Sequence, residues 1–301
     1  MRIKIGNAKY FKGIINTLHQ ITDELTFTTA AKGLIFRQMD PSHVSMIDFV
    51  YPKQAMDDYI VNPDEIDKQI TFNVPTFLKV LKSLNRDTQI VLESTDDEKL
   101  LVKLVESSIQ QNFMVSTLEP DIELPPAPKL THTAHVKILT KALFQAVESF
   151  KNVEIIDIRF STYVDKFVLT TKEKSDVSPI IAFDKDNDNI LKIENSETRT
   201  WADYSANYLY PFLKALKAIA DVITLRYSSR MPLEIEPELY NQMQFKFYLA
   251  PRWHEETKDT DAEDTDAETN VATEEAVEEE EIPIPTTEPI PMKPINWAKY
   301  I

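Results

Sequence analysis

The sequence predicts an α+β fold of two similar domains, each with two short helices packed on antiparallel sheets. Three observations carry this prediction: an internal repeat, a proline-rich segment near the middle of the chain, and β-prone runs after each copy of the repeat. A length of 301 residues also fits two domains of ordinary size.

The clearest repeat is the sequence FLKVLK at residues 77–82, which recurs as FLKALK at residues 212–217, an offset of 135 residues. Two β-prone runs separated by a turn follow each copy, at residues 89–94 and 100–105 and again at residues 222–227 and 233–236. Upstream, the apolar pattern of residues 11–18 corresponds to that of residues 144–150. Each half therefore predicts the order helix, strands, helix, strands.

Composition sets the boundaries of the predicted domains. The first domain is residues 1–116, a connector with four prolines is residues 117–131, and the second domain is residues 132–253. Residues 254–301 hold 15 acidic and 3 basic side chains, so most of the formal net charge of −16 lies in this tail. We expect the acidic, proline-rich tail to be disordered, because it has few large apolar side chains to bury.

Several classes of function are disfavoured by what the sequence lacks. Cysteine is absent, and the only glycines are Gly6, Gly13 and Gly33, so neither a nucleotide-binding glycine loop nor a G-x-S-x-G elbow can form. The pair His132 and His135 lacks an evident third metal ligand. We therefore expect no metal, no cofactor and no enzyme. The absence of a signal peptide and of a long apolar run predicts an intracellular protein with no membrane partner.

Lysine pairs recur on the predicted helices. Three of the four helices carry two lysines on the face opposite the apolar stripe: Lys9, Lys12, Lys79, Lys82, Lys214 and Lys217. A single pair would be an ordinary solvated face, but repetition on related helices indicates contacts with phosphates. On the fourth helix Lys141 is followed by Gln145 and Glu148, which predicts a weak contribution.

Three motifs carry a resemblance to a known family. GLIFRQMDPSHVS at residues 33–45 closely resembles the signature of the proliferating cell nuclear antigen (PCNA) sliding clamps. Residues 231–233 (MPL) and 248–251 (YLAP) resemble two more motifs of that family, in the same order. The resemblance covers residues 1 to about 253 and favours an archaeal-type clamp, to which this chain adds the acidic tail.

The resemblance implies a DNA polymerase processivity factor: a homotrimeric ring around duplex DNA, bound without regard to sequence, with the six lysines facing the DNA. It also implies that DNA polymerase, clamp loader, ligase and flap nuclease bind through PIP motifs during replication and repair. A subunit of a heterotrimeric or checkpoint-type clamp is the alternative, and a nuclease or phosphatase is the enzymatic one. With no basic import cluster we expect a prokaryotic cytoplasm, or a nucleus if the chain is eukaryotic.

The resemblance also assigns residues to two surfaces. A pocket for PIP motifs would be lined by Met39, His43, Val44, Pro232, Tyr248, Ala250 and Pro251, with Leu124 and Pro125 added from the connector. Without the family resemblance, a lone histidine beside a turn, such as His43, is usually a structural residue. Subunit contacts would come from edge strands near residues 108–115 and 177–183, through Ile109, Phe113, Ile180 and Ile181.

The tail ends in PINWAKYI, where large apolar residues return. In a degenerate PIP pattern, Trp297 takes the aliphatic position and Tyr300 and Ile301 take the final pair, with Pro294 in place of glutamine. A solubilising tail with an unrelated terminal peptide is the alternative. The pattern predicts a self-binding motif that docks in the partner pocket and inhibits or filters other ligands.

Overall fold

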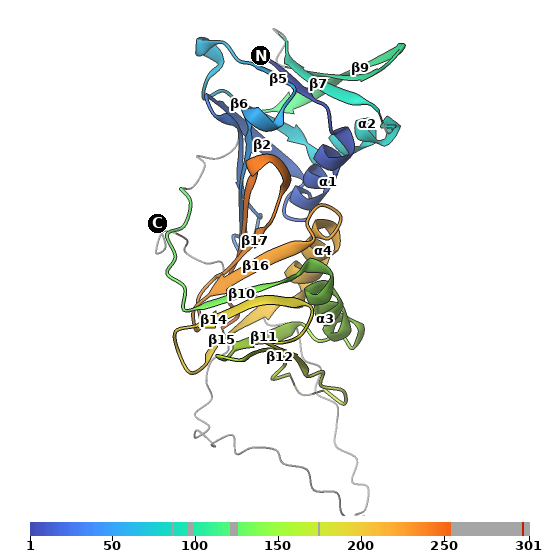
Figure 1. Cartoon of the computed structure of the whole chain (residues 1–301). Coiled ribbons are helices and arrows are strands. Elements are labelled where there is room, and N and C mark those ends of the chain that lie inside the picture. Colours follow the sequence, from blue (N-terminus) through green and yellow to red (C-terminus); the bar gives the residue numbers. More distant parts are fainter. Residues whose placement is uncertain (86, 96–98, 121–125, 174, 254–296, 298–301) are drawn as a thin grey trace, which may run out of the picture.

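The computed structural model describes residues 1–85, 87–95, 99–120, 126–173, 175–253 and 297. The helices lie together on one side of the molecule and the sheets cover the other (Figure 1). Within these residues, no helix is long and apolar enough to cross a membrane.

The described residues of the first half form nine strands, two α-helices and three single 3₁₀ turns. These elements are β1 (Arg2–Ile5), α1 (Ala8–Leu18), β2 (Glu24–Ala30), β3 (Gly33–Met39), β4 (Ser45–Pro52), η1 (Lys53–Ala55), β5 (Asp58–Ile60), η2 (Pro63–Glu65), β6 (Gln69–Asn73), α2 (Val74–Val80), η3 (Leu81–Ser83), β7 (Gln89–Ser94), β8 (Lys99–Glu106) and β9 (Ile109–Leu118).

The second half repeats this order of helices and strands. Its elements are β10 (Ala134–Leu139), α3 (Thr140–Asn152), β11 (Asp157–Thr162), β12 (Lys166–Thr170), β13 (Ile181–Asp184), β14 (Ile190–Asn195), β15 (Thr200–Ser205), α4 (Ala206–Leu216), β16 (Val222–Tyr227), β17 (Leu233–Pro237), η4 (Tyr240–Gln242) and β18 (Gln244–Leu249). The α+β fold predicted from the sequence is confirmed.

Sheet topology repeats as well as element order. In the first half the strands run β5-β1-β7-β8-β9 and β4-β3-β2-β6, and in the second half β14-β10-β16-β17-β18 and β13-β12-β11-β15. The two patterns are the same once β1 is matched to β10, α1 to α3, and so on along the chain. The sequence repeat therefore reflects two copies of one unit.

Local sequence explains where α1 and α2 begin. The side chain of Asn7 accepts a hydrogen bond from the backbone N–H of Tyr10 at the start of α1 (3.1 Å), and Asn73 does the same for Thr76 at the start of α2 (3.0 Å). The apolar stripe of each helix is buried against the sheets, except that Leu78 and Leu84 on and beyond α2 are only half-buried.

The two halves are joined by direct pairing of β4 with β18, antiparallel from Ser45 opposite Leu249 to Val50 opposite Gln244. This junction and the short pairing of β6 with β9 together make one continuous sheet of 14 strands, and β13-β12-β11-β15 forms a separate sheet of four. The connector does not hold the halves together alone. Its residues 126–131 run along the side opposite the helices (Figure 1).

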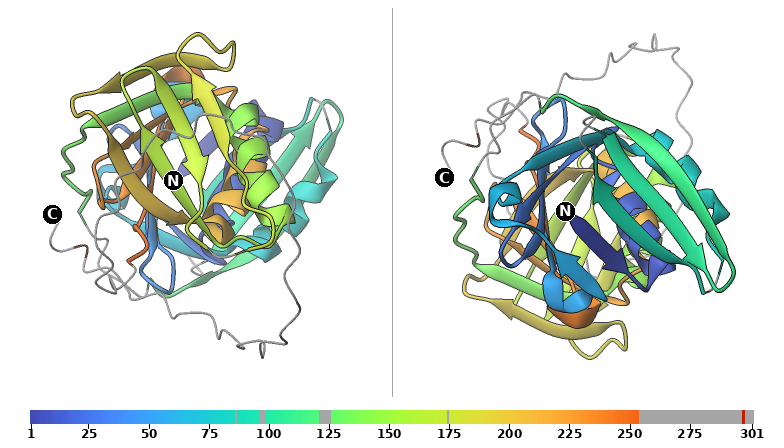
Figure 2. Two further views of the ribbon diagram at one scale, coloured as in Figure 1. Left: turned by 90° about the horizontal axis from the view of Figure 1, so that it is seen from below. Right: turned by 90° about the horizontal axis from the view of Figure 1, so that it is seen from above.

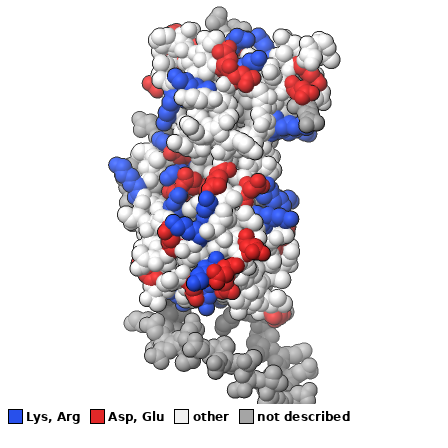
Figure 3. Space-filling model, in the orientation of Figure 1, with Lys and Arg blue, Asp and Glu red and all other residues white. Residues whose placement is uncertain are grey.

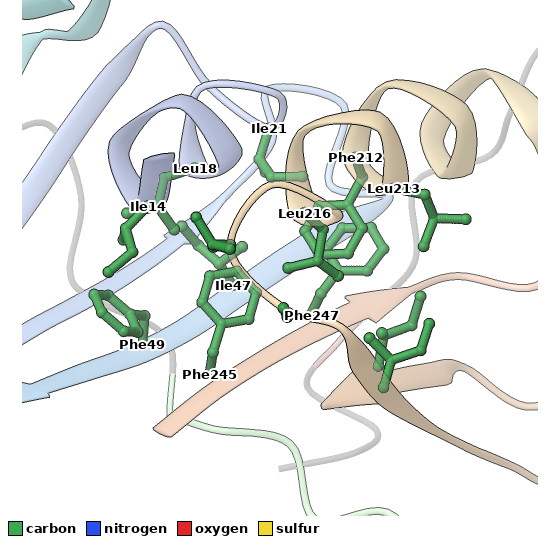
Figure 4. Packing of buried hydrophobic residues seen from close by; sticks show 14 of the residues in the cluster. Ile14, Leu18, Ile21, Ile47, Phe49, Phe212, Leu213, Leu216, Phe245 and Phe247 are labelled. Carbon is green, nitrogen blue, oxygen red and sulfur yellow. The ribbon is translucent and has the colours of Figure 1, made fainter. Parts of the chain in front are cut away.

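Behind the junction the halves share one hydrophobic core. Side chains of β4 and β18 meet those of α1 and α4 between the sheet and the helices, as Figure 4 shows. The rings of Phe212 and Phe247 stack at a centroid distance of 4.0 Å, and Phe49 lies 5.6 Å from Phe245 across the junction. Burial of several aromatic side chains here makes the relative placement of the halves part of the fold itself.

Close packing at this junction explains one of the three glycines. A Cβ on Gly13 of α1 would lie 2.4 Å from Cγ2 of Ile219, which follows α4. Only glycine allows α1 to approach the second half this closely.

Candidate functional site

The helix side of the molecule carries the six predicted lysines. Lys9, Lys79, Lys82, Lys214 and Lys217 are exposed, and Lys12 is half-buried. Both views of Figure 2 place the four helices together, and Figure 3 shows basic atoms along that edge, with acidic groups between them. The structure therefore brings lysines from α1, α2, η3 and α4 to one side of the chain.

Two of these lysines lie over aromatic rings. The Nζ of Lys217 is 3.6 Å from the ring centre of Phe144 on α3, and that of Lys214 is 5.6 Å from the ring centre of Tyr210. Within the part of the chain that the structure describes, none of the six amines pairs with a carboxylate. The charges of Lys214 and Lys217 therefore lie against aromatic rings, and no described acid neutralises any of the six lysines.

On the opposite side, the loop after β3 is fixed by Asp40. The buried carboxylate of Asp40 accepts hydrogen bonds from the backbone N–H groups of Ser42 (3.0 Å), Val44 (2.8 Å) and Ser45, and from the hydroxyl of Tyr208 on α4 (3.2 Å). The loop places His43 at a φ of 56°, a left-handed conformation. The imidazole of His43 is exposed, and its carbonyl group faces the outer surface of the sheet.

Next to this loop, an apolar row crosses three strands. Met39 of β3 lies opposite Met46 of β4, and Met46 lies opposite Tyr248 of β18. Directly opposite residues in neighbouring strands project from the same face. The adjacent pair Ile47 and Phe247 points into the core in Figure 4, so the row of Met46 and Tyr248 lies on the other face of the sheet. The next row on that face is charged: Arg37 donates to both carboxylate oxygens of Asp48 at 3.0–3.1 Å.

Beyond Tyr248, the next residue across the sheet is a charged one. Glu234 of β17 lies directly opposite Tyr248, and it is buried. Its carboxylate pairs with Arg226 (2.9 Å), Lys246 (3.3 Å) and His132 (3.6 Å). Burial alone would raise the pKa of Glu234, but His132 and Lys246 outweigh it and lower the pKa to about 2. Burial also raises the pKa of Tyr248, so its phenol is neutral.

Trp297 covers the apolar row. It is only 4% exposed, and it clusters with Met46 and Tyr248 and with the half-buried Met39 and Leu130. Its indole N–H donates to the carbonyl oxygen of His43 (3.0 Å), and its ring meets that of Tyr248 edge-on at 6.4 Å. We call Met39, Met46, Tyr248 and Leu130, with the His43 carbonyl, the outer pocket.

The predicted pocket residues fall into three groups. Met39, the His43 backbone and Tyr248 lie in the outer pocket, whereas Val44, Pro232, Ala250 and Pro251 are buried and do not belong to its apolar cluster. Val44 and Ala250 belong to the main core and are linked by the bond from the Ala250 N–H to the Val44 carbonyl (2.9 Å). Leu124 and Pro125 lie outside the described residues, as do Tyr300 and Ile301 of the predicted self-binding motif. Sequence reasoning missed Met46 and Leu130, although Met46 follows directly on the motif of residues 33–45.

Both predicted interface strands have an open edge. Among the residues that the structure describes, strand β9 pairs with β8 along most of its length but with β6 only at Thr117 and Leu118, and β13 pairs only with β12. Ile109 and Ile180 are 60% and 75% exposed, and Phe113 and Ile181 are half-buried. Strand β13 begins at Ile181, so it is shorter than the run predicted at residues 177–183.

No group of three or more His, Asp or Glu side chains that could hold a metal ion occurs among the described residues. His135 lies beside His132, with ring centroids 6.2 Å apart, and its pKa is lowered chiefly by burial.

Comparison with known proteins adds independent support. The model of the PCNA N-terminal domain matches residues 1–123. A DNA polymerase sliding clamp of Nitrosopumilus maritimus is 30% identical over 258 residues, covering 83% of this chain and 97% of that protein. This chain belongs to the PCNA family of sliding clamps.

Solved structures of the family agree with the fold of this sliding clamp. PCNA from Thermococcus kodakaraensis superimposes with a TM-score of 0.76 at 26% identity, covering 83% of this chain and 99% of that one. A complex of two different PCNA chains from Sulfolobus tokodaii gives 0.74 at 24% identity, covering 84% and 99% of the respective chains. The alignments therefore cover almost the whole length of these relatives, but they leave about a sixth of this chain unmatched.

Proposed function

We propose that this sliding clamp closes into a homotrimeric ring around duplex DNA and tethers DNA polymerase and other PIP-bearing replication and repair proteins to it. In this role it carries out no reaction of its own. A ring is retained on DNA by topology, so its contacts with phosphates need be neither strong nor specific.

The open edges of β9 and β13 are the observation that best supports a ring. Within the chain, the halves are joined by pairing β18 with β4. In the duplicated topology β9 is the counterpart of β18, and β13 is the counterpart of β4. Pairing β9 of one copy with β13 of the next would therefore repeat the internal junction between subunits. The same step would bury the exposed Ile109 and Ile180 and satisfy the open backbone groups.

Repetition of one junction also explains why DNA would meet the helices. A ring made by repeating one unit presents the same side of every unit to its centre. We assign this place to the helix side, because it carries the lysines of α1, α2, η3 and α4. Unpaired lysines attract phosphates without reading bases, which suits a protein that must slide.

The outer pocket supports the partner role, because it is an apolar row beside an oriented backbone carbonyl, as a peptide with apolar anchors and a donor requires. The archaeal relatives support a place in DNA replication in a prokaryotic cytoplasm. DNA polymerase is the partner that the name of the N. maritimus relative supports. Clamp loader, ligase and flap nuclease are inferred from the family resemblance alone.

The DNA-facing role is tested by replacing four of the lysines with alanine: Lys79, Lys82, Lys214 and Lys217. A matched control replaces four exposed lysines of the turns and connector instead: Lys32, Lys53, Lys68 and Lys129. Polymerase processivity on primed DNA, measured across a salt series, should fall and lose salt sensitivity in the first variant only. Equal processivity of both variants at every salt concentration would contradict the assignment of these lysines to the DNA-facing side.

A heterotrimeric ring is the second candidate. It is supported by the S. tokodaii complex, in which two different clamp chains associate. Light scattering of the purified chain separates the two candidates. A stable trimer of this chain alone supports the homotrimer, whereas a monomer or dimer supports the heterotrimer.

A further inference from the structure

We propose that the end of the acidic tail is an intramolecular ligand of the outer pocket, held by Trp297, and that it must leave before another protein can bind there. The second half of this proposal rests on the partner role proposed above. The first half, docking of the tail, rests only on the contacts of Trp297.

Trp297 makes the contacts of a specific anchor. Nearly all of its side chain is buried, although the described residues that it contacts lie far from it along the chain. Its single polar group is satisfied by the His43 carbonyl at 3.0 Å, and its ring packs edge-on against Tyr248. An indole combines a large apolar surface with one donor, which is why tryptophan is a frequent anchor residue in protein interfaces.

The pocket is built before the anchor arrives. Asp40 fixes the loop that presents the His43 carbonyl, and the pairing of β3, β4 and β18 fixes the apolar row. A preformed site loses little conformational freedom on binding. Without Trp297, the row of Met39, Met46 and Tyr248 would lie open to solvent on the outer face, an arrangement typical of a binding surface.

The length of the tail allows docking within one chain. About 43 residues separate Trp253, the last described residue of the second half, from Trp297. A flexible chain of that length spans roughly 36 Å on average, which sets an effective concentration on the order of 1 mM. A terminal peptide with an affinity of about 100 µM would then fill the pocket about nine-tenths of the time and weaken a competitor about tenfold.

Docking itself is tested by fluorescence of the full-length protein. Subtracting the spectrum of the W297F variant from that of the wild type isolates the emission of Trp297. We expect blue-shifted emission that acrylamide quenches poorly, compared with a synthetic peptide of residues 291–301. The same emission and quenching as the free peptide would overturn the proposal, and neither result depends on DNA or polymerase.

Competition is tested with the same peptide, labelled, as the probe. The full-length W297A variant should bind the peptide about tenfold more tightly than the wild type. The control is W253A, because Trp253 is 64% exposed and precedes the tail; it should bind like the wild type. Equal affinity of W297A and wild type would overturn the competition.

A final mixture identifies the chain that supplies the tail. Rings are assembled from a mixture of two variant chains. The W297A chain has an intact pocket but no anchor, and the Met39→Glu chain has the anchor but a damaged pocket. Exposed Trp297 emission in the mixture supports docking within one chain, whereas shielded emission would assign the tail to a neighbouring subunit and overturn the intramolecular proposal. If docking succeeds but the wild-type protein fails to stimulate polymerase, the proposed function fails and the tail contact stands.

Discussion

Replacing Glu234 with glutamine should make the stability of the clamp less sensitive to acid. The buried carboxylate faces Arg226, Lys246 and His132, and its pKa is lowered to about 2 from the ordinary 4.5. Because the folded-state pKa lies below the unfolded one, the stabilisation is present above pH 4.5 and is lost as the pH falls towards 2. A shift of about 2.5 units corresponds to about 3 kcal/mol at pH 7 and about 1.4 kcal/mol at pH 3.

The assay is denaturant unfolding of the wild type and E234Q at pH 7, 4 and 3, at one fixed protein concentration because subunit association contributes to apparent stability. The difference in unfolding free energy should shrink by about half between pH 7 and pH 3. The control is Glu238→Gln, since the Glu238 side chain is 56% exposed and its pair with Lys137 should contribute under about 1 kcal/mol. A pH-independent difference for E234Q would refute the electrostatic account of this cluster.

Three further changes test the packing and the assembly. Ile181→Asp on the open edge of β13 should dissociate the ring, and an unchanged mass by light scattering would contradict the interface. Gly13→Ala should lower the unfolding free energy by about 1–3 kcal/mol, and Ile219→Ala should relieve the added clash in a double-mutant cycle. Tyr204→Phe removes the buried hydroxyl that donates to the Met231 carbonyl (2.8 Å), and it should cost about 1–2 kcal/mol in thermal unfolding.

Much of the local structure could be predicted from the sequence. The repeat at residues 77–82 and 212–217 lies on α2 with η3 and on α4, and the β-prone runs at residues 89–94 and 222–227 coincide with β7 and β16. Apolar periodicity and turn composition are local properties, so they identify elements before any tertiary contact is known. The division into residues 1–116, 117–131, 132–253 and 254–301 remains a prediction, and β9 extends to Leu118, two residues into the predicted connector.

The outer pocket could be predicted only in part. Motif resemblance pointed to Met39, His43 and Tyr248, but it did not separate side chains that line the pocket from Val44 and Ala250, which lie in the core. That distinction depends on strand register, because neighbouring residues of a strand project from opposite faces. Met46 was missed because only its register between Met39 and Tyr248 places it in the row.

The sequence by itself determined the two-copy plan, the lysine-bearing helices and the anchor residue in the tail, since repeats, periodicity and composition are written along the chain. The tertiary structure alone decided that β18 pairs with β4, that β9 and β13 keep open edges, and that Trp297 meets the His43 carbonyl. These contacts join residues far apart in sequence, and they depend on which strand edges and apolar faces remain unpaired after each unit has folded.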